Sequence, residues 1–350
     1  MNKIIQVYIE NGDFTNFKKS INSLSQKELG LIIKEIDSLK ETNERFLKAR
    51  NFICIKGFKD LINKILTLSS DEEINKEKEP FKARSKEITK FVNELDFEVF
   101  KQIVKHIGTI PENIEHDSTE EKLYSKASDI VLARCFKELG LRSKALDERG
   151  NSADVLAESI YDGYSLVADA KCFRMSRTAK NQKDFKINAL SEWRGSENEY
   201  AVLVSPYYQY PAKKSQIYAD ALNKEVCLLS WEHMYVFLKY GLKETDESTL
   251  ENIWKISQTI ARDKKLAYLS RENCFLSKVN KLLAKKLCIS EEQLESELNL
   301  FKKFISARAD DEIQYWENEI TEIKNYSKEK AINELLKAKK LNELIRILIL

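Results

Sequence analysis

Four short apolar runs in the middle of the chain constrain its fold more than any other feature. Each run is rich in β-branched residues and bounded by turn residues, which is typical of strands. The predicted strands are residues 153–158, 164–171, 200–205 and 225–230. Helical patterns at 183–194 and 214–224 lie between the later strands. A hairpin followed by alternating helices and strands predicts a mixed α/β core.

Helical patterns surround this core. The chain has only 9 glycines and 4 prolines in 350 residues, which favours helices over an all-β fold. A charged, proline-containing segment at 69–87 is interpreted as a solvated connection, and 86–107 as one helix. We expect three parts: a helical N-terminal region at 1–116, a core at 117–245 and a helical C-terminal region at 246–350.

Composition excludes several classes of protein. The formal net charge is +2, so only local clusters of charge can indicate a polyanionic partner. The six cysteines form no C-x-x-C pair, which argues against a zinc ribbon and a disulfide scaffold. With three histidines, a histidine-rich metal site is disfavoured. No signal-peptide pattern or membrane span is evident, so a reduced, cytoplasmic protein is expected.

The first two strands are predicted to pair as a hairpin. Asp162-Gly163 is a strong turn signal, and a turn centred there places Asp154 opposite Lys171. Asp169 then lies diagonal to Asp154. Because side chains alternate along a strand, Asp154, Asp169 and Lys171 are expected on one face.

Two carboxylates and an ammonium on one face suggest phosphodiester hydrolysis. Asp154 and Asp169 offer the hard oxygen ligands that Mg²⁺ prefers, and Lys171 can orient water or stabilise charge on a phosphate. The alternative is a surface ion-pair cluster. Asp129 lies on an apolar helical face, so it is either a further acid of this site or a residue at the rim that reaches water.

The helix that carries Asp129 is expected to begin at a capping box. Ser118 and Glu121 have the required S-x-x-E spacing, and Gly140 supplies a stop signal. Glu120 is interpreted as a first-turn acid that complements the helix dipole.

A basic row follows the acid-and-lysine element. Cations recur every third residue from Lys171 to Lys186, which suits contacts with a phosphate backbone. The alternative is a solvated loop. The candidate DNA-binding residues are Arg174, Arg177, Lys180, Asn181, Gln182 and Lys183. The tyrosine-rich segment 205–218 is interpreted mainly as a packed loop, and Trp231 and His233 as structural residues.

These residues resemble a known family. The second acid, Asp169, lies in a D-x-K motif that resembles the PD-(D/E)xK nuclease core. The segments "STEEKLYSKASDIVLARCFKELG", "LVADAKCFRMSRTAKNQKDFKINALSEWR" and "LLSWEHM" resemble HindIII-type type II restriction endonucleases. The resemblance is close from about residue 100 to 245, weaker beyond, and absent from the first fifty or so residues.

The resemblance implies a homodimeric, Mg²⁺-dependent endonuclease that cuts double-stranded DNA at the palindrome AAGCTT after the first A, leaving 5′ overhangs. It implies a cognate methyltransferase as a functional partner. It makes Asp154 and Asp169 the metal-binding acids and Lys171 the catalytic lysine, with Asp129 where many members carry a glutamate. Ala153 replaces the proline of the motif name. Two alternatives stay open: a nuclease of this type with another target, and a non-catalytic DNA-binding module.

Overall fold

The structure, a computed structural model, describes residues 2–147, 152–176, 182–212, 215–263 and 275–338. Its helices before the core are α1 Lys3–Asn11, α2 Phe14–Asn22, α3 Gln26–Ser38, α4 Glu44–Ser69, α5 Glu72–Asn75, α6 Pro80–Glu94 and α7 Phe97–His106. The helices of the core are α8 Thr119–Glu138, α9 Gln182–Phe185, α10 Ile187–Arg194, α11 Gln216–Asn223 and α12 Trp231–Lys239, with the 3-10 turn η1 Tyr207–Gln209. Those that follow are α13 Glu251–Trp254, α14 Ile256–Ala261, α16 Phe275–Lys286, α17 Glu291–Lys324 and α18 Lys328–Ala338.

A mixed sheet lies at the centre of the described chain. Its five strands, in spatial order, are β2 Arg142–Ala145, β3 Val155–Glu158, β4 Ser165–Ala170, β6 Tyr200–Ser205 and β7 Val226–Ser230. The first three strands are antiparallel, whereas β4, β6 and β7 are parallel. A small parallel pair, β1 Thr109–Ile110 and β5 Phe173–Arg174, lies beside it. The predicted mixed α/β core is confirmed.

All four predicted strands are present, each within one or two residues of its expected bounds. Strand β2 was not predicted, because its residues "RSKA" alternate between exposed and buried positions but lack an apolar run. Strands β1 and β5 were also not predicted, because they are only two residues long and form by pairing with each other. Strands this short at a sheet edge carry too little periodicity to stand out in sequence.

The register of the hairpin differs from the prediction. Val155 pairs with Ala168 and Glu158 with Ser165, so the register is shifted by two residues and Asp154 does not lie opposite Lys171. The turn is longer because the Ser159 hydroxyl accepts hydrogen bonds from the backbone N–H groups of residues 161 and 162. A two-residue shift leaves every side chain on the same face of the sheet, so Asp154, Asp169 and Lys171 are still expected on one face.

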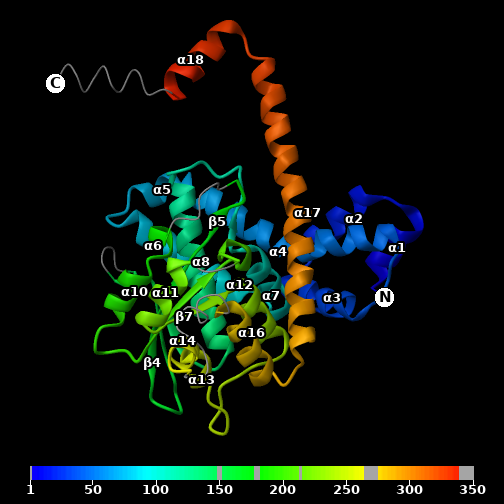
Figure 1. Ribbon diagram of the computed structural model, residues 1–350. Helices are drawn as coiled ribbons and strands as arrows, with labels where there is room; N and C mark the ends of the chain where they lie inside the picture. The colour runs from blue at the N-terminus through cyan, green and yellow to red at the C-terminus, as the bar shows by residue number, and fades with distance from the viewer. Residues whose placement is uncertain (1, 148–151, 177–181, 213–214, 264–274, 339–350) are drawn as a thin grey trace, which may run out of the picture.

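Helices cover both faces of the sheet (Figure 1). On one side, α8 contacts β2, β3 and β4, and is itself packed against α4 and α6. On the other side, α10 contacts β4, β6 and β7, while α11 and α14 contact β7. The sheet therefore forms the middle layer of a continuous apolar core that includes fully buried residues such as Phe136, Leu203 and Trp254.

Two predictions for the N-terminal region are wrong in detail. The segment 69–87 contains α5 and the start of α6, because Pro80 occupies the first turn of α6, where its missing N–H costs nothing. The helix expected over 86–107 is two helices. The first ends at Glu94, where Leu95 takes an extended conformation, and Asp96 caps the second by accepting a hydrogen bond from the backbone N–H of Glu98. The helical character of the region itself is confirmed.

The longest helix, α17, crosses the molecule and then projects beyond it, with α18 turning back at its far end (Figure 1). Its anchor is the buried Arg308, whose guanidinium donates to the carbonyl groups of His106 and Thr109 at 2.9 and 2.8 Å. Among the described helices, none is long and apolar enough to span a membrane.

Candidate active site

Three carboxylates from separate parts of the fold meet at one end of the sheet. Asp154 directly precedes β3, Asp169 lies near the end of β4, and Asp129 lies in the middle of α8. Each offers an oxygen atom within 4.8 Å of the other two. If the β3–β4 register continues by one residue, Asp154 lies opposite Asp169. The hairpin therefore joins the two acids that the sequence analysis placed on one face, and α8 adds the third.

Lys171 follows β4 and completes the cluster. Its ammonium forms an ion pair with Oδ2 of Asp169. Its backbone is fixed on both sides: the N–H donates to the carbonyl of Val204 at 2.7 Å, and the carbonyl accepts from Nε1 of Trp231 at 2.9 Å. The side chain of Lys171 is 14% exposed and that of Asp169 is 1% exposed, so the pair is nearly enclosed.

Burial and like charge shape the protonation of this cluster. Burial, together with Asp154 and Asp169, raises the pKa of Asp129 well above its ordinary value. Burial and Asp154 raise the pKa of Asp169 to about 6, although Lys171 opposes the shift. Burial alone would lower the pKa of Lys171, but the three carboxylates raise it. Ionised carboxylates in this buried site therefore repel one another, and a bound cation would remove that repulsion.

The position of Asp129 decides between the two interpretations of its sequence pattern. Asp129 shares a buried helical face with Leu132 and Phe136, and it is only 6% exposed. It therefore does not reach water at the rim of the apolar face. Its neighbours across the site are instead Asp154 and Asp169. Whether Asp129 binds a metal stays a prediction.

The side chain of Arg174 in β5 is largely buried. Its guanidinium pairs with Glu121 at 2.8 Å and donates to the carbonyl of Pro111 at 3.2 Å.

The predicted capping box at the start of α8 is only half formed. Ser118 accepts from the N–H of Glu121, whereas the Glu121 carboxylate accepts from the N–H of Asp117. In a complete capping box the Glu121 carboxylate would accept from the N–H of Ser118. Here it accepts from the N–H of the preceding residue, Asp117, whose backbone is left-handed with φ of 61°.

Three of the six predicted DNA-contacting residues lie outside the described residues. These are Arg177, Lys180 and Asn181. Gln182 and Lys183 begin α9, and their side chains are also outside the description. Lys186, the last cation of the row, is exposed between α9 and α10. The contacts of this row with DNA stay predictions.

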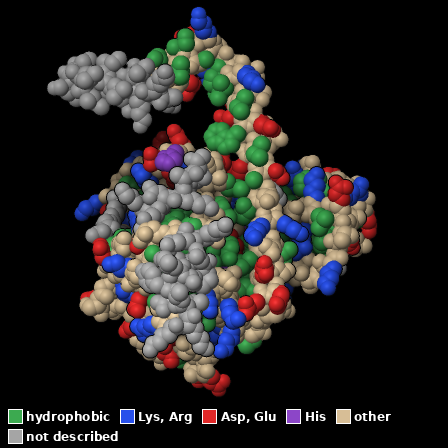
Figure 2. Space-filling view, in the orientation of Figure 1, with side chains coloured by type: hydrophobic (Ala, Val, Ile, Leu, Met, Phe, Trp, Pro, Cys, Tyr) green, Lys and Arg blue, Asp and Glu red, His purple; other side chains and the backbone are tan. Residues whose placement is uncertain are grey.

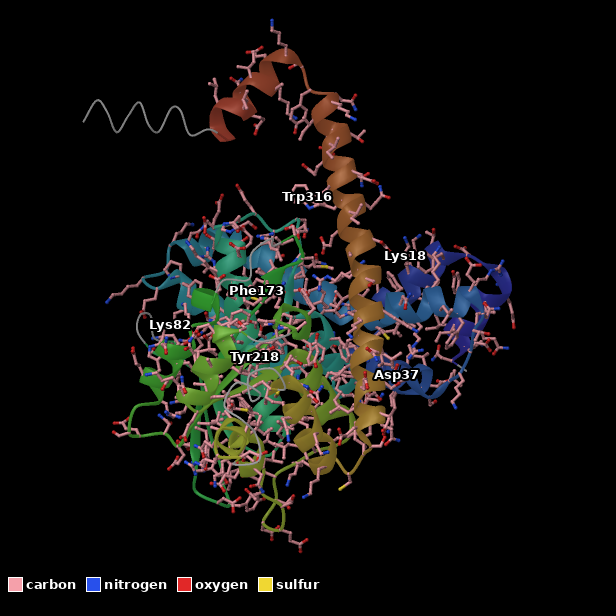
Figure 3. The ribbon with its side chains drawn as sticks, viewed as in Figure 1. Lys18, Asp37, Lys82, Phe173, Tyr218 and Trp316 are labelled. Atoms are coloured by element: carbon pink, nitrogen blue, oxygen red, sulfur yellow. The ribbon has the colours of Figure 1, made fainter. Side chains whose placement is uncertain are left out.

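The tyrosine-rich segment packs as expected. The hydroxyl of the buried Tyr210 donates to the carbonyl of Leu229 at 2.7 Å, and that of Tyr218 donates to the carbonyl of Pro211 at 2.5 Å. Tyr218 also stacks on Phe275, with ring centroids 5.0 Å apart, and is labelled in Figure 3. These tyrosines therefore brace the protein interior.

Trp231 and His233 are buried, in agreement with their structural interpretation. His233 closes a capping box with Ser230 at the start of α12 and contacts Asn280 at 3.0 Å. The hydrogen bond from Trp231 to Lys171 was not predicted, because it joins residues sixty positions apart. Gly108 permits the link, because a Cβ atom there would lie 2.4 Å from the Trp231 ring.

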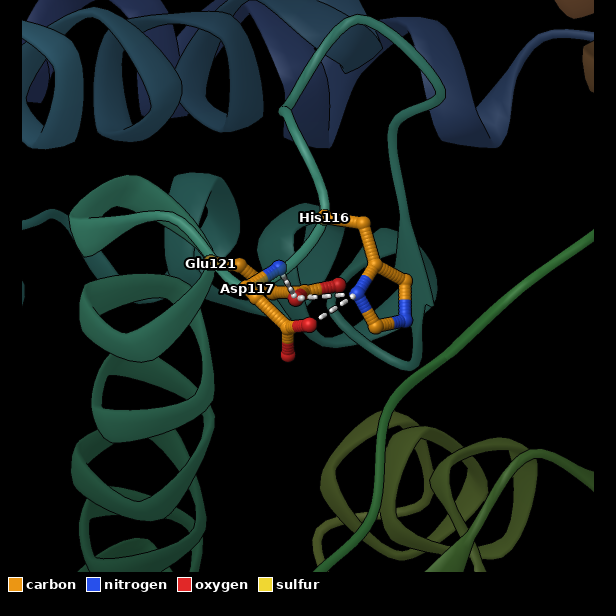
Figure 4. A group of neighbouring side chains, drawn as sticks. All are labelled: His116, Asp117 and Glu121. Carbon is orange, nitrogen blue, oxygen red and sulfur yellow. Dashed lines mark hydrogen bonds and ion pairs between the residues drawn. The ribbon is translucent and has the colours of Figure 1, made fainter. Parts of the chain in front are cut away.

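A second group of possible metal ligands lies at the start of α8: His116, Asp117 and Glu121 (Figure 4). Nδ1 of His116 lies 3.1 Å from Oδ2 of Asp117, and both side chains are largely exposed. Glu121 is already engaged by Arg174. We assign no metal to this exposed cluster.

A mixed sheet that carries two acids and a lysine at the end of its hairpin has the arrangement expected of a PD-(D/E)xK nuclease. The family model of the HindIII restriction endonuclease matches residues 59–349. The type II restriction enzyme HindIII of Haemophilus influenzae is 42% identical over 279 residues, which cover 80% of this chain and 91% of that protein. The chain belongs to the HindIII restriction endonuclease family. It is a site-specific endonuclease that hydrolyses double-stranded DNA.

Proposed function

We propose that Asp154 and Asp169 hold a Mg²⁺ ion during cleavage, with Asp129 beside them. The supporting observation is the convergence of three carboxylates within 4.8 Å of one another. Oδ1 of Asp169 has no hydrogen-bond partner within the described part of the chain and is available to a metal ion, whereas Oδ2 forms the ion pair with Lys171. Hard carboxylate oxygens suit Mg²⁺, which binds few protein ligands. When bound, such an ion polarises a phosphoryl oxygen and lowers the pKa of a bound water.

Lys171 is proposed as the catalytic lysine. The carboxylates around it raise its pKa, which keeps the ammonium charged at neutral pH. A charged ammonium beside the scissile phosphate stabilises the negative charge that develops there in the transition state. The two backbone hydrogen bonds of Lys171, to Val204 and Trp231, fix the position of the backbone from which the side chain extends.

We infer that the target is AAGCTT, cut after the first A to leave 5′ overhangs. The support is membership of the family together with 42% identity to its H. influenzae relative. Residues 174–183 are proposed to contact the DNA, since this row begins three residues after Lys171. A cognate methyltransferase would protect the same site in the host, and both enzymes would act in the cytoplasm.

A palindrome calls for two copies of the chain, each cutting one strand. The projecting part of α17 offers a surface for the second copy, because Ile313, Trp316, Ile320 and Ile323 are exposed and spaced to share one helical face. Apolar side chains are visible along this part of the molecule in Figure 2, and Figure 3 labels Trp316 there.

The charge of the projecting part favours a protein over DNA as its partner. Residues 309–324 contain six acidic residues and one lysine. Negative charge at this density is repelled by a phosphate backbone, which is itself negative. We therefore propose that this part of α17 packs against a second copy and does not follow the DNA.

Sequencing the ends of digested plasmid DNA tests the target directly. The protein is incubated with plasmid DNA and Mg²⁺, and the termini of the fragments are read. Ends confined to A/AGCTT with four-base 5′ overhangs support the proposal. Ends at another single sequence would overturn the inferred target, and scattered or structure-dependent ends would favour the alternative of a nuclease that recognises DNA structure.

A further inference from the structure

A pocket of about 470 Å³ lies between the N-terminal helices and the rest of the protein. Helices α3 and α4 line one side, and α7, α12 and α17 line the other. Figure 3 labels Asp37, at the end of α3, beside the lower half of α17. A cavity of this size is typical of small-molecule sites. We refer to it as the α3–α17 pocket.

The N-terminal side of the α3–α17 pocket lies outside the segment that the family model matches. Residues 34–54 supply this side, whereas the family model begins at residue 59. The opposite side belongs to the matched segment. The pocket thus lies partly outside the segment that matches the family model, and the cleavage proposed above makes no use of it.

The α3–α17 pocket has more positive than negative side chains. Five cations and three carboxylates line it, and each carboxylate is paired with a cation. The pairs are Asp37 with Arg50 at 3.2 Å, Glu98 with Lys101 at 2.8 Å, and Glu297 with Lys239 at 2.6 Å. Two lysines, Lys34 and Lys105, are left over.

Of these two lysines, Lys105 is the stronger candidate for binding an anion in the pocket, because it is partly buried whereas Lys34 is exposed. No described residue forms a hydrogen bond or an ion pair with the Lys105 ammonium, which lies 4.5 Å from the centre of the Tyr235 ring. Desolvation lowers its pKa. A withdrawn ammonium without an ion-pair partner is costly, and the face of the Tyr235 ring offsets only part of that cost, so an anion beside Lys105 would be favourable.

The remaining walls indicate what could carry that charge. Phe301, Phe304 and Tyr235 form an apolar and aromatic side of the pocket. We propose that the α3–α17 pocket binds a small molecule that carries an oxyanion on an aromatic group, with the oxyanion at Lys105 and the ring against Tyr235 and Phe301.

Thermal unfolding of the full-length protein with phenyl phosphate as the probe tests this proposal. Phenyl phosphate at millimolar concentration is expected to raise the Tm of the wild-type protein by about 2 °C or more. Phenol, which lacks the oxyanion, is expected to leave the Tm unchanged. Inorganic phosphate at the same ionic strength should act more weakly than phenyl phosphate, and benzoate shows which oxyanion the site prefers.

Variants of Lys105 locate the binding. Lys105→Met should lose the Tm rise and bind phenyl phosphate at least tenfold more weakly by calorimetry, whereas Lys105→Arg should retain both. The Lys105→Met protein without ligand should unfold no earlier than the wild type, because it no longer withdraws a charge from water. Lys82→Met is the matched control, since the half-buried Lys82 forms an ion pair with Glu79 and lies far from the pocket in Figure 3.

Two results would overturn the proposal. One is a wild-type protein whose Tm phenyl phosphate does not change. The other is a Lys105→Met protein that is stabilised as much as the wild type, which would place the bound phosphate elsewhere, for example beside Lys171. DNA cleavage by Lys105→Met at the wild-type rate is expected in every case, so failure of the pocket and failure of the nuclease site are distinguishable.

Discussion

The indole Nε1 of Trp231 donates a hydrogen bond to the backbone carbonyl of Lys171 at 2.9 Å. Trp231 begins α12, directly after β7, and Lys171 follows β4. The contact therefore crosses the end of the parallel part of the sheet. It fixes the position from which the proposed catalytic lysine extends.

Trp231→Phe is expected to slow cleavage about tenfold while leaving DNA affinity unchanged, because a small displacement of a catalytic group is costly. The lost hydrogen bond should also lower the unfolding free energy by about 1–3 kcal/mol. Single-turnover rates and DNA binding without metal check both effects.

Trp254→Phe is the matched control for this change. The Nε1 of Trp254 donates to the hydroxyl of Tyr164 at 2.9 Å, near the opposite end of β4. This variant should lose similar stability and keep its cleavage rate. Equal slowing of both variants would show that Trp231 acts through general stability.

Asp129→Asn removes one of three converging charges. The metal-free protein is expected to unfold at a higher temperature, because the repulsion with Asp154 and Asp169 is reduced. Half-maximal cleavage should require a higher Mg²⁺ concentration, which a titration of the cleavage rate measures. Asp162→Asn, in the exposed hairpin turn, is the control. An unchanged Mg²⁺ requirement in Asp129→Asn would remove Asp129 from the site.

Much of the core could be predicted because its signals are local. The apolar runs of β3, β4, β6 and β7 and the helical patterns between them identify their elements without long-range information. The hairpin register could not be predicted, because the Ser159 hydroxyl, and not the Asp162-Gly163 pair alone, sets the length of the turn. Strand periodicity still predicted which side chains share a face, because a shift of two residues leaves every side chain on the same face of its strand.

The features of the site that could not be predicted are contacts between segments far apart in the sequence. The approach of Asp129 to Asp154 depends on how α8 packs on the hairpin, and sequence periodicity reports only that Asp129 shares a face with apolar residues. The pairing of Arg174 with Glu121 likewise joins residues more than fifty positions apart. Neither contact has a local signal.

Protonation of His233 is expected to contribute to acid unfolding. Burial lowers the pKa of His233 to about 4, whereas an unfolded histidine titrates near 6.5. Between these values the unfolded state binds more protons, so the unfolding free energy falls as the pH drops, by at most about 1.4 kcal/mol per unit.

Denaturant unfolding between pH 4 and pH 7 measures this contribution. The free energy of His233→Gln should depend on pH less steeply than that of the wild type. His116→Gln, which changes an exposed histidine, should follow the wild-type slope. Parallel curves for His233→Gln and the wild type would contradict a buried neutral histidine.

The projecting part of α17 is expected to hold the dimer together. Trp316→Glu combined with Ile320→Glu places charge on the exposed apolar face and should convert a dimer into a monomer by light scattering. Glu317→Gln combined with Asn318→Asp, on the same turn, keeps that apolar face and should leave the dimer intact. A wild-type protein that is monomeric both alone and on DNA would contradict the proposed pairing.

The central claim is that the Asp154, Asp169 and Lys171 cluster performs the cleavage. Single-turnover cleavage of plasmid DNA with Mg²⁺ by the wild type, Asp169→Asn, Lys171→Met and the Asp162→Asn control tests it most directly. We predict that the first two variants cut at least about a thousandfold more slowly but still bind DNA, and that Asp162→Asn cuts normally. Cleavage by Asp169→Asn or Lys171→Met at the wild-type rate would contradict the account.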